Sequence, residues 1–404
     1  EENFMPTIHE LIASERDRQT NNINLIASEN YVSEYVQNAM GTAFTNKYAE
    51  GYPGKRWYGG CEFTDQIEQH AIDLAKEVFG AEHANVQPHS GTQSNLAAYL
   101  ALINPGDKVL AFKLEHGGHL SHGAPFNASG KFYDFVHYGV SRDTGLIDMD
   151  EYERLLKENP DIKLVVAGAS SYPRAIDFEK MASMAKAQGA KFMADIAHIS
   201  GLVAAGEHQS PVPFSDAVTM STHKTIRGPR GGMIVCPKKR ANKIDRAVFP
   251  GCQGGPLVHV IAAKAAMLEE ASKPEFKTYI QNTIKNAKAL AAAFMGIEGD
   301  KYKVLTGGTD NHMVMIDISG TGKNGLEVEN IMGEQGMYVN KNFIPYDPLP
   351  NSETSGIRIG SPLLTSMGAN EEDMGRVVTW IDKAVSGENV SNEVHAFMKE
   401  LGER

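Results

Sequence analysis

The stretch AVTMSTHKTIRGPRGG, residues 217–232, decides the fold of this chain. It opens with an apolar run of strand length and continues through Ser221, Thr222 and His223 to Lys224. Two arginines and three glycines follow within eight residues. Ligands of open α/β sheets collect at the carboxyl ends of strands, which is where this pattern puts the lysine. The strand before Lys224 and the glycines and arginines after it therefore predict a chemical role for this lysine, since a solvated surface lysine does not require such neighbours.

Further strand-length apolar runs surround this stretch and alternate with amphipathic helical segments. The predicted strands span 107–112, 162–168, 190–195, 215–221 and 231–236. Helical patterns occupy 149–159 and 178–189, the second closed by a glycine. Strands alternating with helices predict an α/β domain with a mostly parallel central sheet flanked by helices.

The C-terminal part of the sequence has a different pattern. Long helical segments at 257–271 and 279–295 precede strand-like runs at 301–308 and 312–319, and a helical tail begins at Glu371. We therefore expect a large α/β domain at 51–275 and a smaller α+β domain at 276–404.

Composition narrows the class of protein. The 404 residues are 42% hydrophobic and 22% charged, as in ordinary globular proteins, and the net charge of −11 argues against nucleic acid or an anionic membrane as the main partner. Three cysteines at no metal-ligand spacing predict a reduced, cytoplasmic protein without disulfides. No apolar run reaches the roughly 18 residues that a membrane helix needs.

Polar side chains follow four of the predicted strands. They are His116, His119, His122, Ser170, Ser171, Tyr172, Asp195, His198 and Lys224. Upstream, Ser90, Gly91 and Thr92 directly precede an apolar-periodic helix, where free backbone N–H groups and hydroxyls form a phosphate cradle. This is neither a P-loop nor a dinucleotide fingerprint.

A phosphate cradle, a strand-end acid and a strand-end lysine together indicate pyridoxal phosphate. That cofactor needs a lysine for its Schiff base, an anion site, and a carboxylate that keeps the pyridine nitrogen protonated. Asp195 and Lys224, 29 residues apart, suit two successive strand ends. Simpler interpretations exist, because Asp195, Ser90 and Thr92 could each only cap a helix. The three histidines suggest a metal cluster, but the glycines among them disfavour one.

Ten ordered motifs extend this interpretation over essentially the whole chain. They are NLIASEN, NKYAEGYPGKRWYGGCE, HSGTQSN, LEHGGHLSHG, ADIAHISGLVAAG, STHKTIRGPRGG, FPGCQGGPLVHVIAAKA, GGTDNHMVMID, VNKNFIP and SGIRIGSP. With them the chain resembles the serine hydroxymethyltransferase family of fold-type I pyridoxal-phosphate enzymes, whose fold is similar to that of aspartate aminotransferase.

The resemblance implies roles for individual residues. Lys224 would carry the cofactor, Asp195 would pair with the pyridine nitrogen, His119 would stack on the ring, and Ser170 and His198 would lie near its phenolic oxygen. The phosphate would be held by Ser90, Gly91, Thr92 and His223, with Gly254 and Gly255 from a second subunit. Arg358 and Ser28 would bind the substrate carboxylate. Glu50 and Tyr58 of the partner would face the substrate hydroxyl and the folate, with Tyr48 lining the same pocket. The folate contacts would be Glu50, Tyr58, Leu114, Gly118, Leu120 and Asn342.

The resemblance also implies the reaction and the assembly. Serine and glycine would be interconverted through an external aldimine and a quinonoid, with the hydroxymethyl unit passing to tetrahydrofolate to give 5,10-methylenetetrahydrofolate. Glu50 is the candidate proton shuttle. Residues 1–50 would form an N-terminal arm at the interface of a homodimer, with no metal, nucleic acid or membrane involved.

Alternatives remain open at this point. Trp57, Met220 and Ser221 depart from the family pattern, so acceptor choice is in question. An α-methylserine hydroxymethyltransferase or a threonine aldolase would keep Lys224 and Asp195. Two hypotheses assign the chain to other functional classes: a metal-dependent hydrolase and a non-catalytic binding protein.

Overall fold

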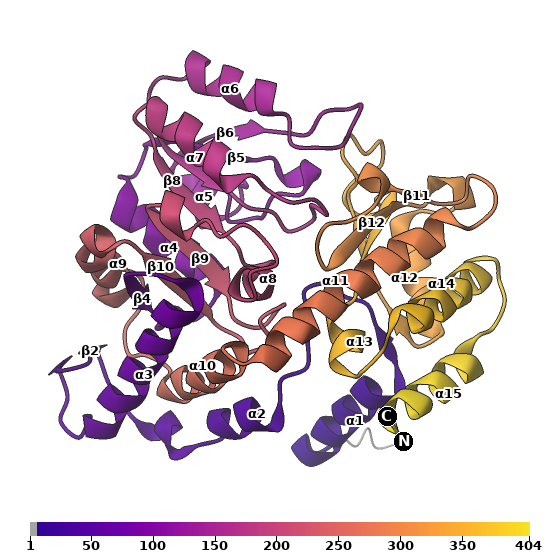
Figure 1. Cartoon of the computed structure of the whole chain (residues 1–404), viewed down its shortest axis with the longest axis horizontal. Helices are drawn as coiled ribbons and strands as arrows, with labels where there is room; N and C mark the ends of the chain where they lie inside the picture. Colours follow the sequence, from indigo (N-terminus) through magenta and orange to yellow (C-terminus); the bar gives the residue numbers. More distant parts are fainter. Residues whose placement is uncertain (1–5) are drawn as a thin grey trace. The chain divides into compact units, whose positions relative to one another are not determined.

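The computed structural model describes residues 6–404, which form two compact units (Figure 1). The large unit is Ser28–Gln281, and the small unit joins the described residues up to Ala27 with Asn282–Arg404. The boundary between them falls inside one helix, α11 (Pro274–Met295). The domain limits expected at residues 50 and 275 stay predictions.

The large unit is built on a seven-stranded sheet in the order β4-β10-β9-β8-β7-β5-β6. The strands are β4 (His83–Asn85), β5 (Lys108–Phe112), β6 (Asp134–Tyr138), β7 (Ile162–Ala167), β8 (Lys191–Asp195), β9 (Ala217–Ser221) and β10 (Gly232–Cys236). Strands β9, β8, β7, β5 and β6 pair in parallel, and only β10 runs against its neighbours. The mostly parallel sheet predicted from the alternating pattern is confirmed.

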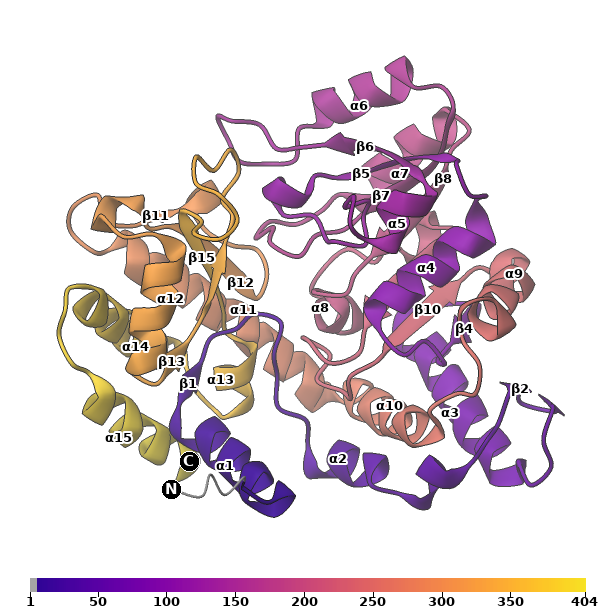
Figure 2. The same cartoon turned by 180° about the vertical axis from the view of Figure 1, so that it is seen from behind.

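Both faces of this sheet are covered. Every residue of β9 and β10 is buried, as a parallel sheet between two layers of helices requires. Alternate strand residues, among them Val109, Leu164, Met193 and Ile234, share one apolar cluster with the helix α4 (Gly91–Leu102). Figure 2 views the chain from behind and shows α4 beside β10. The remaining strand residues point to the opposite face.

Polar side chains cap the starts of several helices of the large unit. Ser90 caps α4, and Asp148 and Asp177 cap α6 (Met149–Glu158) and α7 (Phe178–Ala187). Gly189 follows α7 with a φ of 77°, a left-handed conformation that favours glycine, so the predicted stop is confirmed. The other helices are α2 (Glu34–Met40), α3 (Glu62–Phe79), α5 (Ala128–Phe132), α8 (Ser200–Ala204), α9 (Ala241–Arg246) and α10 (Val258–Ala271), and β2 (Gly51–Tyr52) pairs with β3 (Lys55–Arg56).

The small unit has a four-stranded antiparallel sheet in the order β11-β12-β15-β14. Its strands are β11 (Lys303–Val304), β12 (Met313–Asp317), β14 (Asn340–Asn342) and β15 (Gly356–Gly360), and its helices α12 (Gly325–Glu334), α13 (Pro362–Ser366), α14 (Glu371–Val385) and α15 (Ser391–Gly402). The N-terminal segment belongs here, because β1 (Ile23–Asn24) pairs in parallel with β13 (Met337–Tyr338) and α1 (Ile8–Asn21) contacts α15. The α+β character expected of the C-terminal part is confirmed.

Sequence patterns missed several strands. The strands β1 to β4, β6 and β13 to β15 were not predicted, nor was the helix α12. Six of these strands have only two or three residues, too few for an alternation to show. Within residues 6–404, none of the helices combines the length and the apolar character that crossing a membrane requires.

A buried carboxylate ties the end of the chain to α14. The Asp373 side chain is 3% exposed and accepts hydrogen bonds from the Asn370 backbone N–H at 3.0 Å and from Arg404 Nη1 at 2.6 Å. Burial alone would raise the pKa of Asp373, but the hydrogen bonds of Arg404 and of the Asn370 backbone lower it below its ordinary value.

Asp373 forms part of the N-terminal cap of α14. Replacing it by Asn keeps the shape of the side chain and removes its charge. A depressed pKa means that the charge stabilises the fold above about pH 4, the unfolded value, and that this contribution is lost as pH falls through the folded pKa. We expect Asp373→Asn to cost about 1 kcal/mol at pH 7 and progressively less as the pH falls below about 4, measured as urea midpoints of both proteins. A difference that does not change with pH would contradict a role for the charge.

Candidate functional site

The predicted acid and lysine stand at neighbouring strand ends of the large unit. β8 and β9 are parallel and pair Asp195 with Thr219, five residues before Lys224. Ser170 follows β7, which is parallel to β8 on its other side. The carboxyl ends of these strands therefore meet at one edge, as the sequence predicted.

Lys224 sits in a short closed loop after β9. Its side chain is largely buried, with 9% of the residue exposed. The Lys224 carbonyl accepts from the Arg227 backbone N–H at 3.0 Å and from Asn30 Nδ2 at 3.1 Å. Thr225 Oγ1 donates to the His198 carbonyl at 2.8 Å, which links the loop to the segment after β8. The backbone at the lysine is thus fixed from both sides.

Asp195 is buried inside a polar network that sequence reasoning missed. Its Oδ2 accepts from Asn95 Nδ2 at 2.8 Å and lies 2.8 Å from His122 Nε2, and its Oδ1 accepts from the Ala197 backbone N–H at 2.9 Å. The Asn95 carbonyl oxygen accepts from Thr219 Oγ1 at 2.6 Å. The helix α4, β8 and β9 are therefore joined at this carboxylate. A polar Asn95 on an otherwise apolar helix face was the available signal.

This network keeps the carboxylate ionised. Burial alone would raise the pKa of Asp195, but the hydrogen bond and charge of His122, followed by the charge of His119 and the hydrogen bond of Asn95, lower it well below its usual range. An ionised carboxylate in a buried pocket is the group that can hold a proton on a facing heterocyclic nitrogen.

The three histidines that suggested a metal cluster serve different purposes. His122 contacts Asp195, His119 Nδ1 lies 2.7 Å from Ser121 Oγ, and His116 Nδ1 accepts from the Val140 backbone N–H at 3.1 Å. Nowhere between residues 6 and 404 do three or more His, Cys, Asp or Glu side chains gather as metal ligands would.

The predicted phosphate cradle is packed against the end of β9. Ser90 Oγ accepts from the Gln93 backbone N–H at 3.2 Å and so caps α4. A Cβ on Gly91 would lie 2.7 Å from Ser221 Oγ, so only glycine lets the helix start approach β9 this closely. The residue order then places His223 two positions beyond Ser221. We call Ser90, Gly91, Thr92 and His223 the anion cradle.

His223 has an unused polar atom. Its Nδ1 is buried and has no hydrogen-bond partner among the described residues. Burial, and then the charges of Arg230 and Lys224, lower the pKa of His223 to about 3. A buried nitrogen left unpaired costs free energy, and an added phosphate oxygen would supply the missing partner.

These groups fit pyridoxal phosphate in three separate respects. A buried lysine follows β9, an ionised carboxylate ends β8, and the start of α4, packed against the end of β9, could bind an anion together with the unpaired buried nitrogen of His223. Each corresponds to one demand of the cofactor: the lysine to its aldehyde, the carboxylate to its ring nitrogen, the helix start to its phosphate.

The loop 114–120 carries Leu114, Gly118, His119 and Leu120, four predicted site residues. The Gly117 carbonyl accepts from the Ser170 backbone N–H at 2.8 Å, and the Gly118 N–H donates to the Lys113 carbonyl at 2.9 Å. This loop is therefore attached to the end of β7, close in the fold to Ser170. Leu120 is 44% exposed, which leaves it available to a ligand.

A second group of predicted residues forms an exposed cluster on the same unit. The Tyr48 and Tyr58 ring centroids are 4.9 Å apart. A Cβ on Gly254 would lie 3.4 Å from Glu50 Oε1, and one on Gly255 would lie 3.1 Å from the Tyr48 ring. The charge of Glu50 raises the pKa of Tyr48. We call these five residues the aromatic–glycine cluster; its two tyrosines are 54% and 46% exposed.

The remaining predicted residues lie outside these two groups, and two of them belong to the small unit. Ser28 is half-buried at the start of the large unit. In the small unit, Arg358 lies on β15 and its Nε donates to Asn340 Oδ1 at 3.1 Å, while Asn342 Nδ2 donates to the Phe343 carbonyl at 2.8 Å. Burial lowers the pKa of Arg358 to about 10, so a ligand carboxylate beside this guanidinium would stabilise its charge.

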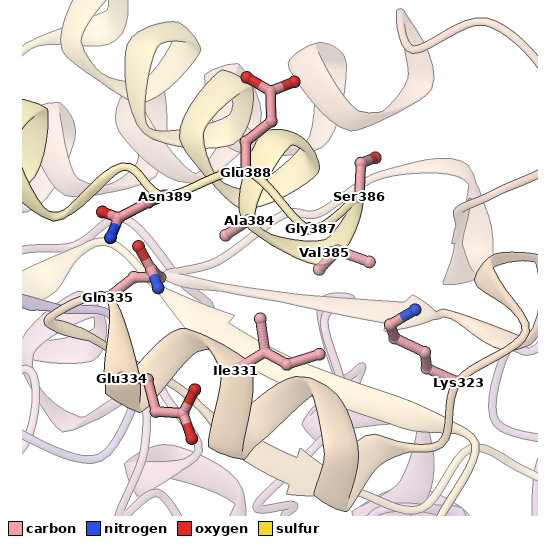
Figure 3. A pocket seen from close by; sticks show the side chains of 10 residues that line it. All are labelled: Lys323, Ile331, Glu334, Gln335, Ala384, Val385, Ser386, Gly387, Glu388 and Asn389. Atoms are coloured by element: carbon pink, nitrogen blue, oxygen red, sulfur yellow. The ribbon is translucent and has the colours of Figure 1, made fainter.

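A hollow elsewhere in the small unit contains none of these residues. It has a volume of about 280 Å³ and lies between α12 and the end of α14 (Figure 3). Ile331 and Val385 line it on an apolar side, whereas Glu388 points away from it. Because none of the predicted site residues lines it, we do not assign the functional site to this hollow.

The fold and the strand-end site define a pyridoxal-phosphate-dependent enzyme of fold-type I. Comparison with known proteins narrows this class. The family model described as serine hydroxymethyltransferase matches residues 2–381. A curated protein of Coprothermobacter proteolyticus named serine hydroxymethyltransferase is 52% identical over 401 residues, which are 99% of this chain and 96% of that relative. The chain belongs to the serine hydroxymethyltransferase family. Its cofactor is pyridoxal phosphate and its co-substrate is tetrahydrofolate.

The contact between His122 and Asp195 generates a double-mutant prediction. In His122→Phe the buried carboxylate of Asp195 loses a side-chain hydrogen-bond partner, and we expect the protein to lose about 1–3 kcal/mol of stability. In His122→Phe/Asp195→Asn the unpaired charge is gone, so part of that loss should be recovered. Unfolding midpoints of the cofactor-free wild type, both single variants and the double variant measure this. Additive effects would contradict the coupling.

Proposed function

We propose that Lys224, Asp195 and the anion cradle of this chain bind pyridoxal phosphate at the strand-end edge of the large unit. The reaction is the interconversion of serine and glycine, with the one-carbon unit passing to tetrahydrofolate to give 5,10-methylenetetrahydrofolate. The family match does not favour the α-methylserine or threonine-aldolase alternatives. The observation that carries the proposal is the buried, ionised Asp195 fixed beside the strand that leads to Lys224.

When bound, pyridoxal phosphate acts as an electron sink for the substrate's Cα. The residues of this chain prepare and hold it. Lys224 Nζ would attach the cofactor, and the Asp195 carboxylate would hold a proton on the pyridine nitrogen. His119 would cover the ring, and Ser170 and His198 would hydrogen-bond its phenolic oxygen.

Further residues of this chain would position the substrate. Arg358 binds the substrate carboxylate, in a pairing that a planar guanidinium makes with two hydrogen bonds, and Ser28 assists it. Glu50 holds and returns the proton at the substrate hydroxyl, with Tyr58 and Tyr48 beside it. The folate contacts Glu50, Tyr58, Leu114, Gly118, Leu120 and Asn342.

The active unit that we propose is a homodimer. Glu50, Tyr58, Gly254 and Gly255, all assigned to the partner's site, lie together in the aromatic–glycine cluster. The rings of Tyr48 and Tyr58 in this cluster are exposed, and so are those of Trp57 and Phe63, which follow in the chain; an interface has such exposed rings before its partner binds. The N-terminal arm, residues 1–50, contributes to the same interface.

We further propose a cytoplasmic location. The chain's cysteines Cys61, Cys236 and Cys252 are free thiols. Burial raises the pKa of Cys236 to about 12, which keeps this thiol protonated and unreactive. Free thiols suit a reducing compartment.

Covalent mapping tests the cofactor assignment. The protein loaded with pyridoxal phosphate is treated with sodium borohydride, digested and weighed by mass spectrometry. We expect the added mass on the peptide that contains Lys224, and none on the peptide of Lys264, another buried lysine of the same unit. Lys224→Ala should lose the attachment and the visible absorbance. Attachment at any other lysine would refute the assignment.

Mixing two inactive variants tests the shared site. In a homodimer that pairs Lys224 of one subunit with Glu50 of the other, Lys224→Ala and Glu50→Gln each inactivate every site. Reassorted mixed dimers regain one intact site, so an equimolar mixture should recover about a quarter of wild-type activity. If both residues serve the same subunit's site, mixing recovers nothing.

A further inference from the structure

A second buried lysine of the large unit has no part in the mechanism above. Lys264 lies in the middle of α10, and only 1% of it is exposed. Its Nζ donates to three backbone carbonyls, those of Val86 at 2.7 Å, Pro88 at 2.9 Å and Gly232 at 2.8 Å. An ammonium group has three protons, so every donor is used. Burial lowers the pKa of Lys264 to about 7, against the opposing charge of Glu68.

The three carbonyls belong to the two segments that form the anion cradle. Val86 and Pro88 lie between β4 and α4, immediately before Ser90. Gly232 is the first residue of β10, directly after the loop that carries His223 and Lys224. The Gly232 N–H also donates to the Pro88 carbonyl at 3.0 Å. A single cationic group therefore connects both sides of the cradle.

The packing around Lys264 leaves it little freedom to move. A Cβ on Gly231 would lie 2.7 Å from Lys264 Cε, so the loop passes as close as glycine permits. The carbonyl between the two lysine acceptors, that of Gln87, accepts from Gln253 Nε2 at 3.0 Å, and Gln253 Oε1 accepts from the His89 N–H at 3.0 Å. Side chains thus set the path of the backbone from Val86 to His89. Burial, and then the charge of Lys264, lower the pKa of His89, so the electrostatic effect of the lysine extends to this segment.

We propose that Lys264 is a positioning residue for the cofactor phosphate, which holds the two segments of the anion cradle in register and places a buried cation among them. The inference rests on the proposed placement of the phosphate at Ser90, Gly91, Thr92 and His223. If Lys264 only supported the fold, removing it would weaken the binding of every ligand of the site to the same extent. If it organises the anion cradle, removing it weakens the binding of ligands that carry a phosphate more than that of ligands without one.

Binding of pyridoxal phosphate and of pyridoxal, which lacks the phosphate, separates these two roles. Both are titrated into the cofactor-free full-length protein and followed by visible absorbance, for the wild type and for Lys264→Met. Methionine keeps much of the side-chain volume and removes the charge and the donors. We expect pyridoxal phosphate to bind about tenfold more weakly or worse, and pyridoxal to change by much less. Equal losses for the two ligands, or none, would overturn the proposal.

Two further variants keep the test decisive. Leu268→Ala leaves a cavity in α10 one turn beyond Lys264, so it should lower the unfolding midpoint without altering the ratio of the two affinities. Gly231→Ala displaces the lysine without removing it and should reduce phosphate preference in the same sense, even if Lys264→Met does not fold. A changed ratio in Leu268→Ala, or an unchanged one in Gly231→Ala, would contradict the proposal.

The affinities of the wild type show which hypothesis is wrong, the placement of the phosphate or the role of Lys264. If the wild type binds pyridoxal as tightly as pyridoxal phosphate, the anion cradle itself is wrongly placed, and the role of Lys264 falls with it. If the wild type prefers the phosphate strongly and Lys264→Met retains that preference, only the inference about Lys264 is wrong.

Discussion

The parallel pairing of β8 with β9 is the constraint on which the rest of the large unit depends. Because the two strands run in the same direction, Asp195 and the loop of Lys224 emerge at one edge of the sheet. Asn95 then fixes α4 to both strands through Asp195 and Thr219, which determines where the start of that helix lies. A register slip between β8 and β9 would reverse the faces of the side chains and separate the acid from the lysine.

Asp195 and Lys264 are two buried titratable groups of the large unit, and their burial is compensated in different ways. Asp195 receives hydrogen bonds from side chains and a backbone amide, with a histidine beside it, whereas Lys264 donates only to carbonyls. Carbonyls carry no charge, so the pKa of the lysine falls while that of the aspartate stays depressed. Both groups lock the segments around them because moving either would leave a buried charge unsatisfied.

The sequence predicted the long elements and the chemistry of the strand ends, since these depend on local patterns. The strands near Asp195 and Lys224 were placed to within two residues, and the cap at Ser90 was recognised. The partners of Asp195 could not be predicted, because Asn95 and His122 are 100 and 73 residues away in the chain and only the fold brings them together. Lys264 escaped notice for a similar reason: within an alanine-rich helix it resembles an ordinary surface lysine.

The small unit is assembled from both ends of the chain, and this has a consequence for biosynthesis. The large unit is one continuous segment, so all of its strands are available once Gln281 has been translated. The helix α1 and the strand β1 are translated long before their partners α15 and β13, with the whole large unit made in between. The helix α1 must therefore wait until the large unit has been translated before it can reach its native packing.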